Sequence, residues 1–166
     1  MRVFGTIFLF IIGLLGPIIW LVNGIEFSQN CGGYLKQAAD ANSVELAISR
    51  LDKAIDYVEK NNLTDGYTSV LWKTEDDNVG FWYQNLKACR NELEDCQNST
   101  QLEQTNTLLK IRESLVDNGE SGTELTLPNG ISRYPHNCAM GILMWLSAIC
   151  LLWGILCLGA YSQYGW

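Results

Sequence analysis

The chain has 166 residues, 48% of them hydrophobic, and a formal net charge of −7 at pH 7. Its charges are segregated: all 18 acidic residues lie between Glu26 and Glu124, ten of the 11 basic residues lie between Lys36 and Arg133, and this middle carries a net charge of −8. Nucleic acids and anionic lipid surfaces bind clusters of Lys and Arg. The acidic middle therefore excludes nucleic acid as a partner.

The chain starts with an uncharged run at residues 3–22, VFGTIFLFIIGLLGPIIWLV. Twenty such residues suffice to cross the roughly 30 Å hydrocarbon core of a bilayer, so the run predicts a transmembrane helix. The alternative is a secretory signal, with Arg2 as a minimal positive region. Against it, the apolar part of such signals is usually only about 7–15 residues long.

A second uncharged run at residues 138–161, CAMGILMWLSAICLLWGILCLGAY, is also long enough to span a bilayer. If both runs cross, the two termini share one side. Arg2 assigns that side to the cytoplasm by the positive-inside rule. We therefore expect residues 31–137 to form an extracytoplasmic domain between two transmembrane helices.

Small residues repeat along one face of the second run, where membrane helices commonly pack closely. The predicted transmembrane packing residues are Gly13 and Gly16 in the first run, and Ser147, Cys150, Gly154 and Cys157 in the second. We expect the second run to pack on the first; a second copy of the chain or another protein is the alternative. Small residues are also common in membrane helices without any packing role.

Two heptad-like seams predict helices in the middle of the chain. The first, at spacings of 4, 3, 4 and 3, consists of Val44, Ile48, Leu51, Ile55 and Val58. The second, at spacings of 3, 4, 3, 4 and 3, consists of Val79, Trp82, Leu86, Cys89, Leu93 and Cys96. Because each seam leaves a narrow apolar stripe, another helix must cover it. The two predicted helices thus form an antiparallel hairpin.

Capping residues predict where these helices begin. Asn42, with Glu45 three residues later, resembles an N-cap, so the segment 34–61 forms either one helix or two. Thr74 or Asp77 is expected to cap the helix of the second seam. An extended apolar connection is expected to join the two seams.

A third helix is predicted from the capping-box pair Thr100 and Glu103 to Asn118-Gly119. Its expected apolar positions are Leu102, Leu108, Leu109, Ile111, Leu115 and Val116. Residues 120–137 then lack a helical pattern and are long enough to return the chain to the membrane as an extended arm. The predicted fold class is all-α: two transmembrane helices flank an extracytoplasmic three-helix antiparallel bundle with an extended return arm.

The six cysteines form no CxxC pair. Cys31 and Cys138 each lie just outside a predicted span and could form a disulfide in an oxidising compartment; two unrelated thiols are the alternative. Cys89 and Cys96 lie about 10 Å apart along one helix, too far to bond each other. We interpret them as small core residues of the seam, with bridging to another helix as the alternative.

The sequence offers no recognisable reactive constellation. His136 is the sole histidine, which excludes a histidine-based triad and a multi-histidine metal site. The acidic run 75–77 lacks the alternation and glycine of a calcium loop and is explained by helix capping. We therefore predict no catalytic residue, no metal site and no cofactor.

Three runs in the middle carry a family resemblance: YLKQAADANSVELA, NNLTDGYTSVLWKTEDDNVGFWYQNLKACRNELE and RESLVDNGESGTELTLPNGISRYPHN. They resemble a group of small, uncharacterised membrane proteins of cyanobacteria and other aquatic bacteria, over most of residues 34–137. The resemblance implies a bacterial cytoplasmic or thylakoid membrane. It implies no activity, cofactor or catalytic residue.

The expected function is non-enzymatic. The helical ectodomain and the spans are expected to mediate protein–protein assembly in a lipid bilayer, as an accessory subunit, scaffold or assembly factor, with another membrane protein or a second copy as partner. The alternative is an extracytoplasmic ligand-sensing domain that acts through a partner protein. A thiol-redox role for Cys89 or Cys96 is the third hypothesis, disfavoured because no neighbour in the sequence lowers either pKa convincingly.

Overall fold

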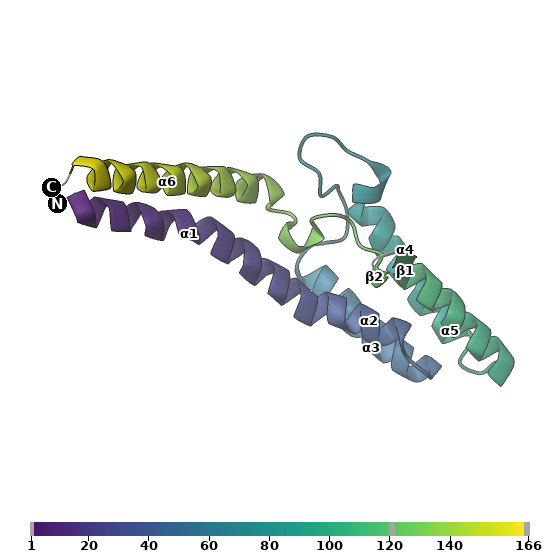
Figure 1. Ribbon diagram of the computed structural model, residues 1–166. Coiled ribbons are helices and arrows are strands. Elements are labelled where there is room, and N and C mark those ends of the chain that lie inside the picture. Colours follow the sequence, from purple (N-terminus) through teal and green to yellow (C-terminus); the bar gives the residue numbers. More distant parts are fainter. Residues whose placement is uncertain (1, 120–121, 165–166) are drawn as a thin grey trace. The chain divides into compact units, whose positions relative to one another are not determined.

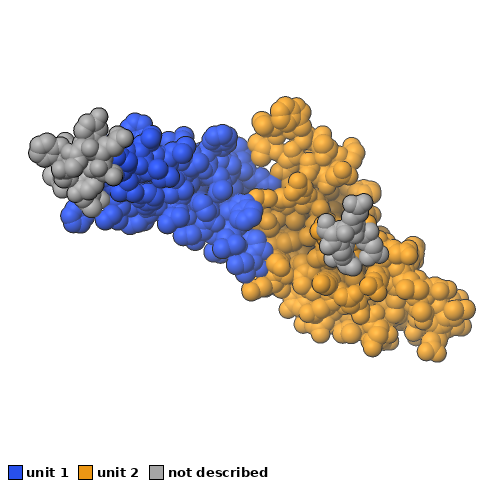
Figure 2. All heavy atoms as spheres, in the orientation of Figure 1, with its two compact units in different colours: residues 1–25, 136–166 blue, residues 26–135 orange. Residues whose placement is uncertain are grey.

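The computed structural model in Figure 1 describes residues 2–119 and 122–164, and it is mostly helical. The chain divides into two compact units (Figure 2). Unit 1 consists of Met1–Ile25 and His136–Trp166, and unit 2 consists of Glu26–Pro135. Unit 1 thus contains both predicted spans, and unit 2 contains nearly all of the charged residues.

Unit 1 is formed by two long apolar helices that pack together, α1 (Arg2–Phe27) and α6 (Asn137–Tyr164) (Figure 1). Both are long and apolar enough to cross a membrane. An N-terminal helix of this composition is also typical of a signal sequence. The helices therefore suggest membrane spans, and the assignment of α1 as a span stays a prediction.

The outer faces of α1 and α6 carry large apolar side chains that contact little protein. The most exposed are Phe4 at 80%, Trp145 at 74%, Leu156 at 67% and Leu152 at 63%. Water-exposed patches of this size are rare on soluble monomers. A lipid environment accommodates such surfaces without the cost of hydrating them.

Among its described residues, 26–119 and 122–135, unit 2 contains four α-helices that follow α1: α2 (Gly33–Ala39), α3 (Val44–Lys60), α4 (Val79–Asp95) and α5 (Gln101–Leu115). Helix α3 packs on α2 and α4, and α5 also packs on α2 and α4, so the four helices surround one core. The predicted three-helix bundle is wrong in this respect. The segment 34–61 forms two helices, and α2 folds back on α3.

The break between α2 and α3 is made by residues 40–43. Ser43 is the N-cap of α3: its backbone is extended, and its Oγ accepts a hydrogen bond from Leu46 N at 3.3 Å. The expected cap at Asn42 is wrong by one residue. Both residue types can cap a helix, and the sequence does not show which of them adopts the extended backbone.

The sequence at 30–33, with two consecutive glycines, favours a flexible exit from the membrane. In the structure residues 28–32 are π-helical instead, and Gly33 begins α2. Gly33 N donates to Ser28 O, and a Cβ at Gly33 would lie only 3.1 Å from the same carbonyl oxygen. Cys31 is fully buried within this segment. Burial of Cys31 and of the following Leu35 explains why the glycines here do not produce a flexible link.

The N-cap of α4 is Asn78, which is not one of the two expected caps. Asn78 Oδ1 accepts a hydrogen bond from Phe81 N at 3.0 Å, so the expected caps Thr74 and Asp77 are wrong. Those two residues stabilise the preceding 3-10 turn (Glu75–Asp77), where Thr74 Oγ1 donates to Asp77 Oδ2 at 2.7 Å. Thr74, Asp77 and Asn78 are all residue types that can cap a helix. The sequence alone therefore does not show which of them caps α4.

The capping box of α5 is confirmed: Glu103 N donates to Thr100 Oγ1 at 3.4 Å, and Thr100 N donates to Glu103 Oε2 at 2.9 Å. The predicted end at 118–119 is wrong, because α5 ends at Leu115.

An antiparallel hairpin of β1 (Val116–Gly119) and β2 (Gly122–Leu125) follows α5, with Val116 opposite Leu125. The all-α prediction therefore needs this correction, and the return arm begins as a hairpin; residue 120, where the arm was expected to begin, lies outside the described residues. The arm later contains a 3-10 turn (Ile131–Arg133). A β-branched residue at 116 favours the extended backbone.

The core of unit 2 contains both predicted seams. Every residue of the two seams is at most 8% exposed, and Leu51, Val58, Val79 and Leu93 are fully buried. Helix α5 contributes Ile111 and Leu115. The expected positions Leu102 and Leu109 are instead 71% and 55% exposed, because only part of α5 faces the core.

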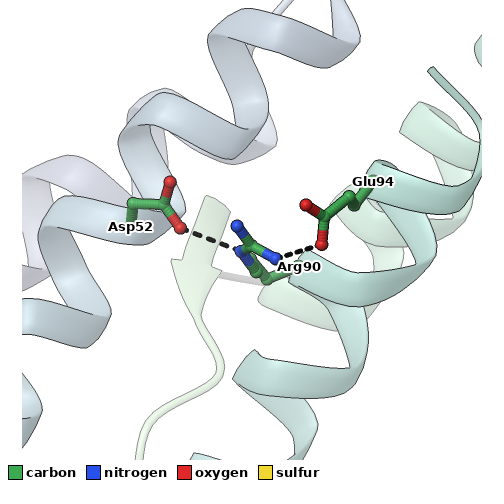
Figure 3. A network of polar contacts seen from close by, with 3 residues as sticks. All are labelled: Asp52, Arg90 and Glu94. Carbon is green, nitrogen blue, oxygen red and sulfur yellow. Dashed lines mark hydrogen bonds and ion pairs between the residues drawn. The ribbon is translucent and has the colours of Figure 1, made fainter.

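Ion pairs link the helices of unit 2 at its surface. Arg90 on α4 donates from Nε to Asp52 Oδ1 on α3 at 3.0 Å and also donates to Glu94 on its own helix (Figure 3). Lys110 Nζ on α5 lies 2.6 Å from Glu92 Oε1 on α4. Exposed pairs of this kind typically contribute less than about 1 kcal/mol each. The buried seams are therefore the main source of stability.

Candidate functional site

The contact between α1 and α6 is built around Gly16 and Ser147. Gly16 N donates to Ser147 Oγ at 3.2 Å, and Ser147 is only 2% exposed. A Cβ at Gly16 would overlap Ser147 Oγ and lie 3.2 Å from Leu143 O, a backbone atom. The absence of a side chain at Gly16 is therefore what permits this close approach.

Two further glycines permit close approach in the same contact. A Cβ at Gly13 would lie 2.6 Å from Leu151 Cγ, and one at Gly154 would lie 3.1 Å from the Phe10 ring. Cys150, also in the predicted strip, is partly buried, as is Cys157. The structure thus places Gly16 against Ser147 of the predicted strip, whereas Gly13 lies against Leu151.

A second feature is the loop that connects α3 with α4, which is closed at its base by backbone hydrogen bonds. Thr68 N donates to Asp77 O at 3.0 Å, and Val79 N donates to Gly66 O at 2.9 Å. Tyr134 Oη donates to Asp65 O at 2.7 Å, which ties this base to the return arm. The loop is therefore held at its base by at least three hydrogen bonds.

The far end of this loop exposes three consecutive apolar side chains, which we call the apolar loop tip: Val70, Leu71 and Trp72. They are 55%, 78% and 76% exposed. Ser69 Oγ donates to Trp72 O and holds the backbone of the tip in a turn. In the sequence these residues belong to the extended apolar connection expected between the two seams. The signal that points to an exposed tip is a valine-leucine-tryptophan run that fits neither seam.

Charged residues follow the tip directly. Glu75 and Asp76 are exposed, and Asp65 is exposed at the other side of the loop base. The Nζ of Lys73 lies 5.1 Å from the centroid of the Tyr67 ring, a cation–π distance. The tip therefore combines an apolar end with a mainly acidic base.

The thiols proposed as a disulfide, Cys31 and Cys138, are both free in the structure. Cys31 belongs to unit 2 and is buried, whereas Cys138 belongs to unit 1 and is exposed. The pairing stays a prediction. Cys89 and Cys96 are also free and buried in the core of unit 2.

Cys89 is expected to react slowly with alkylating reagents at pH 8. Burial, and secondarily the negative charge of Glu92, raise the pKa of its thiol above the ordinary 9.0, and the thiolate is the reactive form. The raised pKa also links the stability of the folded state to pH, because the folded state disfavours the thiolate. The contribution of Cys89 to the free energy of unfolding is present below pH 9.0 and is lost as the pH rises through the raised pKa. Peptide mass spectrometry after iodoacetamide treatment, native and urea-unfolded, measures the difference; equal rates would contradict it.

The titratable groups of the described residues 2–119 and 122–164 form no set of three His, Cys, Asp or Glu side chains that could hold a metal ion. His136 is exposed. Tyr83 Oη donates to Glu59 Oε1 at 2.5 Å, and this bond raises the pKa of the phenol. Tyr83 and Glu59 thus link α4 with α3 at the surface.

Comparison with protein-family models, with curated protein sequences and with solved structures found no match. The candidate sites therefore rest on the geometry of this chain. They are the α1–α6 contact in unit 1 and the apolar loop tip in unit 2.

Proposed function

We propose that the chain is a non-enzymatic, two-span membrane protein whose unit 2 binds another protein, as an accessory subunit, scaffold or assembly factor. The observation that carries this proposal is the apolar loop tip, Val70–Trp72, exposed on a unit whose seams are buried. A tryptophan and a leucine that add nothing to the core are available for a partner. Exposed apolar groups of this kind commonly anchor protein interfaces.

The order of the loop supports a binding role. Immobilising a flexible loop on binding reduces affinity, whereas a loop that is already held loses less entropy. Here the base is closed at Thr68–Asp77 and Gly66–Val79, and Ser69 restrains the tip itself. Trp72 is thereby presented in a preorganised turn.

Unit 1 supports the membrane part of the proposal. The α1–α6 contact supplies specific packing, while exposed apolar side chains cover the outer faces. With Arg2 on the cytoplasmic side, both termini are cytoplasmic and unit 2 is extracytoplasmic. A bacterial cytoplasmic or thylakoid membrane is the location that the family resemblance implies.

The test is affinity purification of the tagged full chain from its native membrane in mild detergent, followed by sizing and mass spectrometry. The variant Leu71→Ser/Trp72→Ser removes the two most exposed apolar side chains of the tip. Its matched control is Leu102→Ser/Leu109→Ser, which changes two comparably exposed apolar residues on α5.

The expected result is a stoichiometric partner with the wild type and the control, and its loss with the tip variant. Recovery of only the chain itself, as monomer or homo-oligomer, would overturn the proposal. If the tip variant still binds the same partner, the apolar loop tip is not the binding surface, and the proposal loses its structural basis.

A further inference from the structure

We propose that the apolar loop tip docks in an apolar pocket of a partner protein whose rim carries Lys and Arg side chains. This inference rests on the proposed function and specifies the chemistry of the partner. The observation behind it is the negative charge next to the tip, at Glu75 and Asp76.

Two exposed carboxylates lie close to the tip along the chain. Glu75 and Asp76 follow Trp72 by three and four residues, so their Cα atoms lie within about 14 Å of the Cα of Trp72 along the backbone. Both side chains are exposed. A surface that receives Trp72 therefore faces these two carboxylates at the edge of the contact.

The same segment also carries a lysine. Lys73 places its Nζ over the Tyr67 ring at 5.1 Å, whereas the carboxylate of Asp77 accepts hydrogen bonds from Thr68 and Thr74. Segment 65–77 contains four carboxylates and one lysine, a net charge of −3. The rim of the tip is acidic even when Lys73 is counted.

The acidic rim favours a partner protein over a lipid surface or a second copy of the chain. Anionic lipid headgroups attract basic segments and repel this one, and unit 2 as a whole has a net charge of −8. A second copy of the chain would bring another unit 2 of net charge −8 to the contact, and like charges facing each other are unfavourable. Opposite charges on a partner protein steer association and align the contact.

The first experiment identifies what the tip contacts. A photo-reactive benzoylphenylalanine replaces Leu71 in the full chain in its native membrane, and the crosslinked peptides are mapped by mass spectrometry. We expect adducts to a protein segment that contains apolar residues together with Lys or Arg. Adducts to lipid, to the chain itself or to an acidic segment would overturn the inference.

The second experiment measures the affinity of the purified full chain for the crosslinked protein between about 50 and about 500 mM NaCl, where screening shortens the Debye length severalfold. Glu75→Gln/Asp76→Asn neutralises the rim. Asp56→Asn/Glu113→Gln is the matched control, because it removes two exposed carboxylates on α3 and α5. Trp72→Ala tests the apolar anchor.

Trp72→Ala is expected to weaken binding by about thirtyfold or more, as for a central interface residue. The neutralised rim should weaken it severalfold at low salt and remove most of the salt dependence, with no change in the control. If Trp72→Ala abolishes binding while the rim variant behaves like wild type, the charged-rim inference fails and the proposed function stands. If Trp72→Ala binds like wild type, both fail.

Discussion

Gly16→Leu is expected to separate α1 from α6 and to lower the thermal stability of unit 1 more than any other single substitution in the contact. A Cβ at this position already overlaps Ser147 Oγ and lies 3.2 Å from the backbone oxygen of Leu143, which a rotamer change cannot move. Overpacking of this kind typically costs about 1–3 kcal/mol. The hydrogen bond from Gly16 N to Ser147 Oγ is lost as well, at about 0.6 kcal/mol.

Circular dichroism during heating in mild detergent, combined with limited proteolysis, measures this effect. The matched control is Gly5→Leu on the same helix, where a Cβ would meet nothing within 4 Å. Ser147→Ala should lie between the two, because it removes the hydrogen bond and leaves the helices in contact. A Gly16→Leu variant that melts like Gly5→Leu would contradict the packing described for α1 and α6.

Leu51→Ala is expected to lower the free energy of unfolding of unit 2 by about 2–5 kcal/mol. Leu51 is fully buried at the centre of the first seam, and its truncation leaves a cavity between helices. Small domains are typically stable by only about 5–15 kcal/mol, so the loss is a large fraction of the total. We expect partial unfolding of the variant at 37 °C.

Urea unfolding of the full chain in detergent measures this change, with hydrogen exchange of the α3 and α4 amides as a readout specific to unit 2. Leu46→Ala is the matched control, since Leu46 lies on the same helix and is 38% exposed. It should lose less than about 1 kcal/mol. Equal losses at positions 46 and 51 would contradict the assignment of the seam to the core.

The sequence by itself determined the features that depend on neighbours along the chain. Residues three and four apart share a helix face, so the spacing from Val44 to Val58 and from Val79 to Cys96 specified both the helices and the faces that are buried. The capping box at Thr100 is equally local, because both of its hydrogen bonds lie within four residues. The two long apolar helices followed from uninterrupted composition.

Features that depend on distant contacts were decided only by the tertiary structure. Asn42 and Ser43 have similar capping ability, and it is Ser43 that adopts the extended backbone and caps α3. Asn78 caps α4 because Thr74 and Asp77 bond to each other in the preceding turn.

The burial of α5 residues and the exposure of Trp72 also depend on distant contacts that the local sequence does not specify. Leu102 and Ile111 are both apolar residues on one helix, yet one is exposed and the other buried, since burial depends on where α2 and α4 lie. Trp72 is 76% exposed, in a loop whose base is closed by hydrogen bonds of Thr68 and Val79. Local spacing fixes which residues share a face, and only the arrangement of the other elements fixes what that face meets.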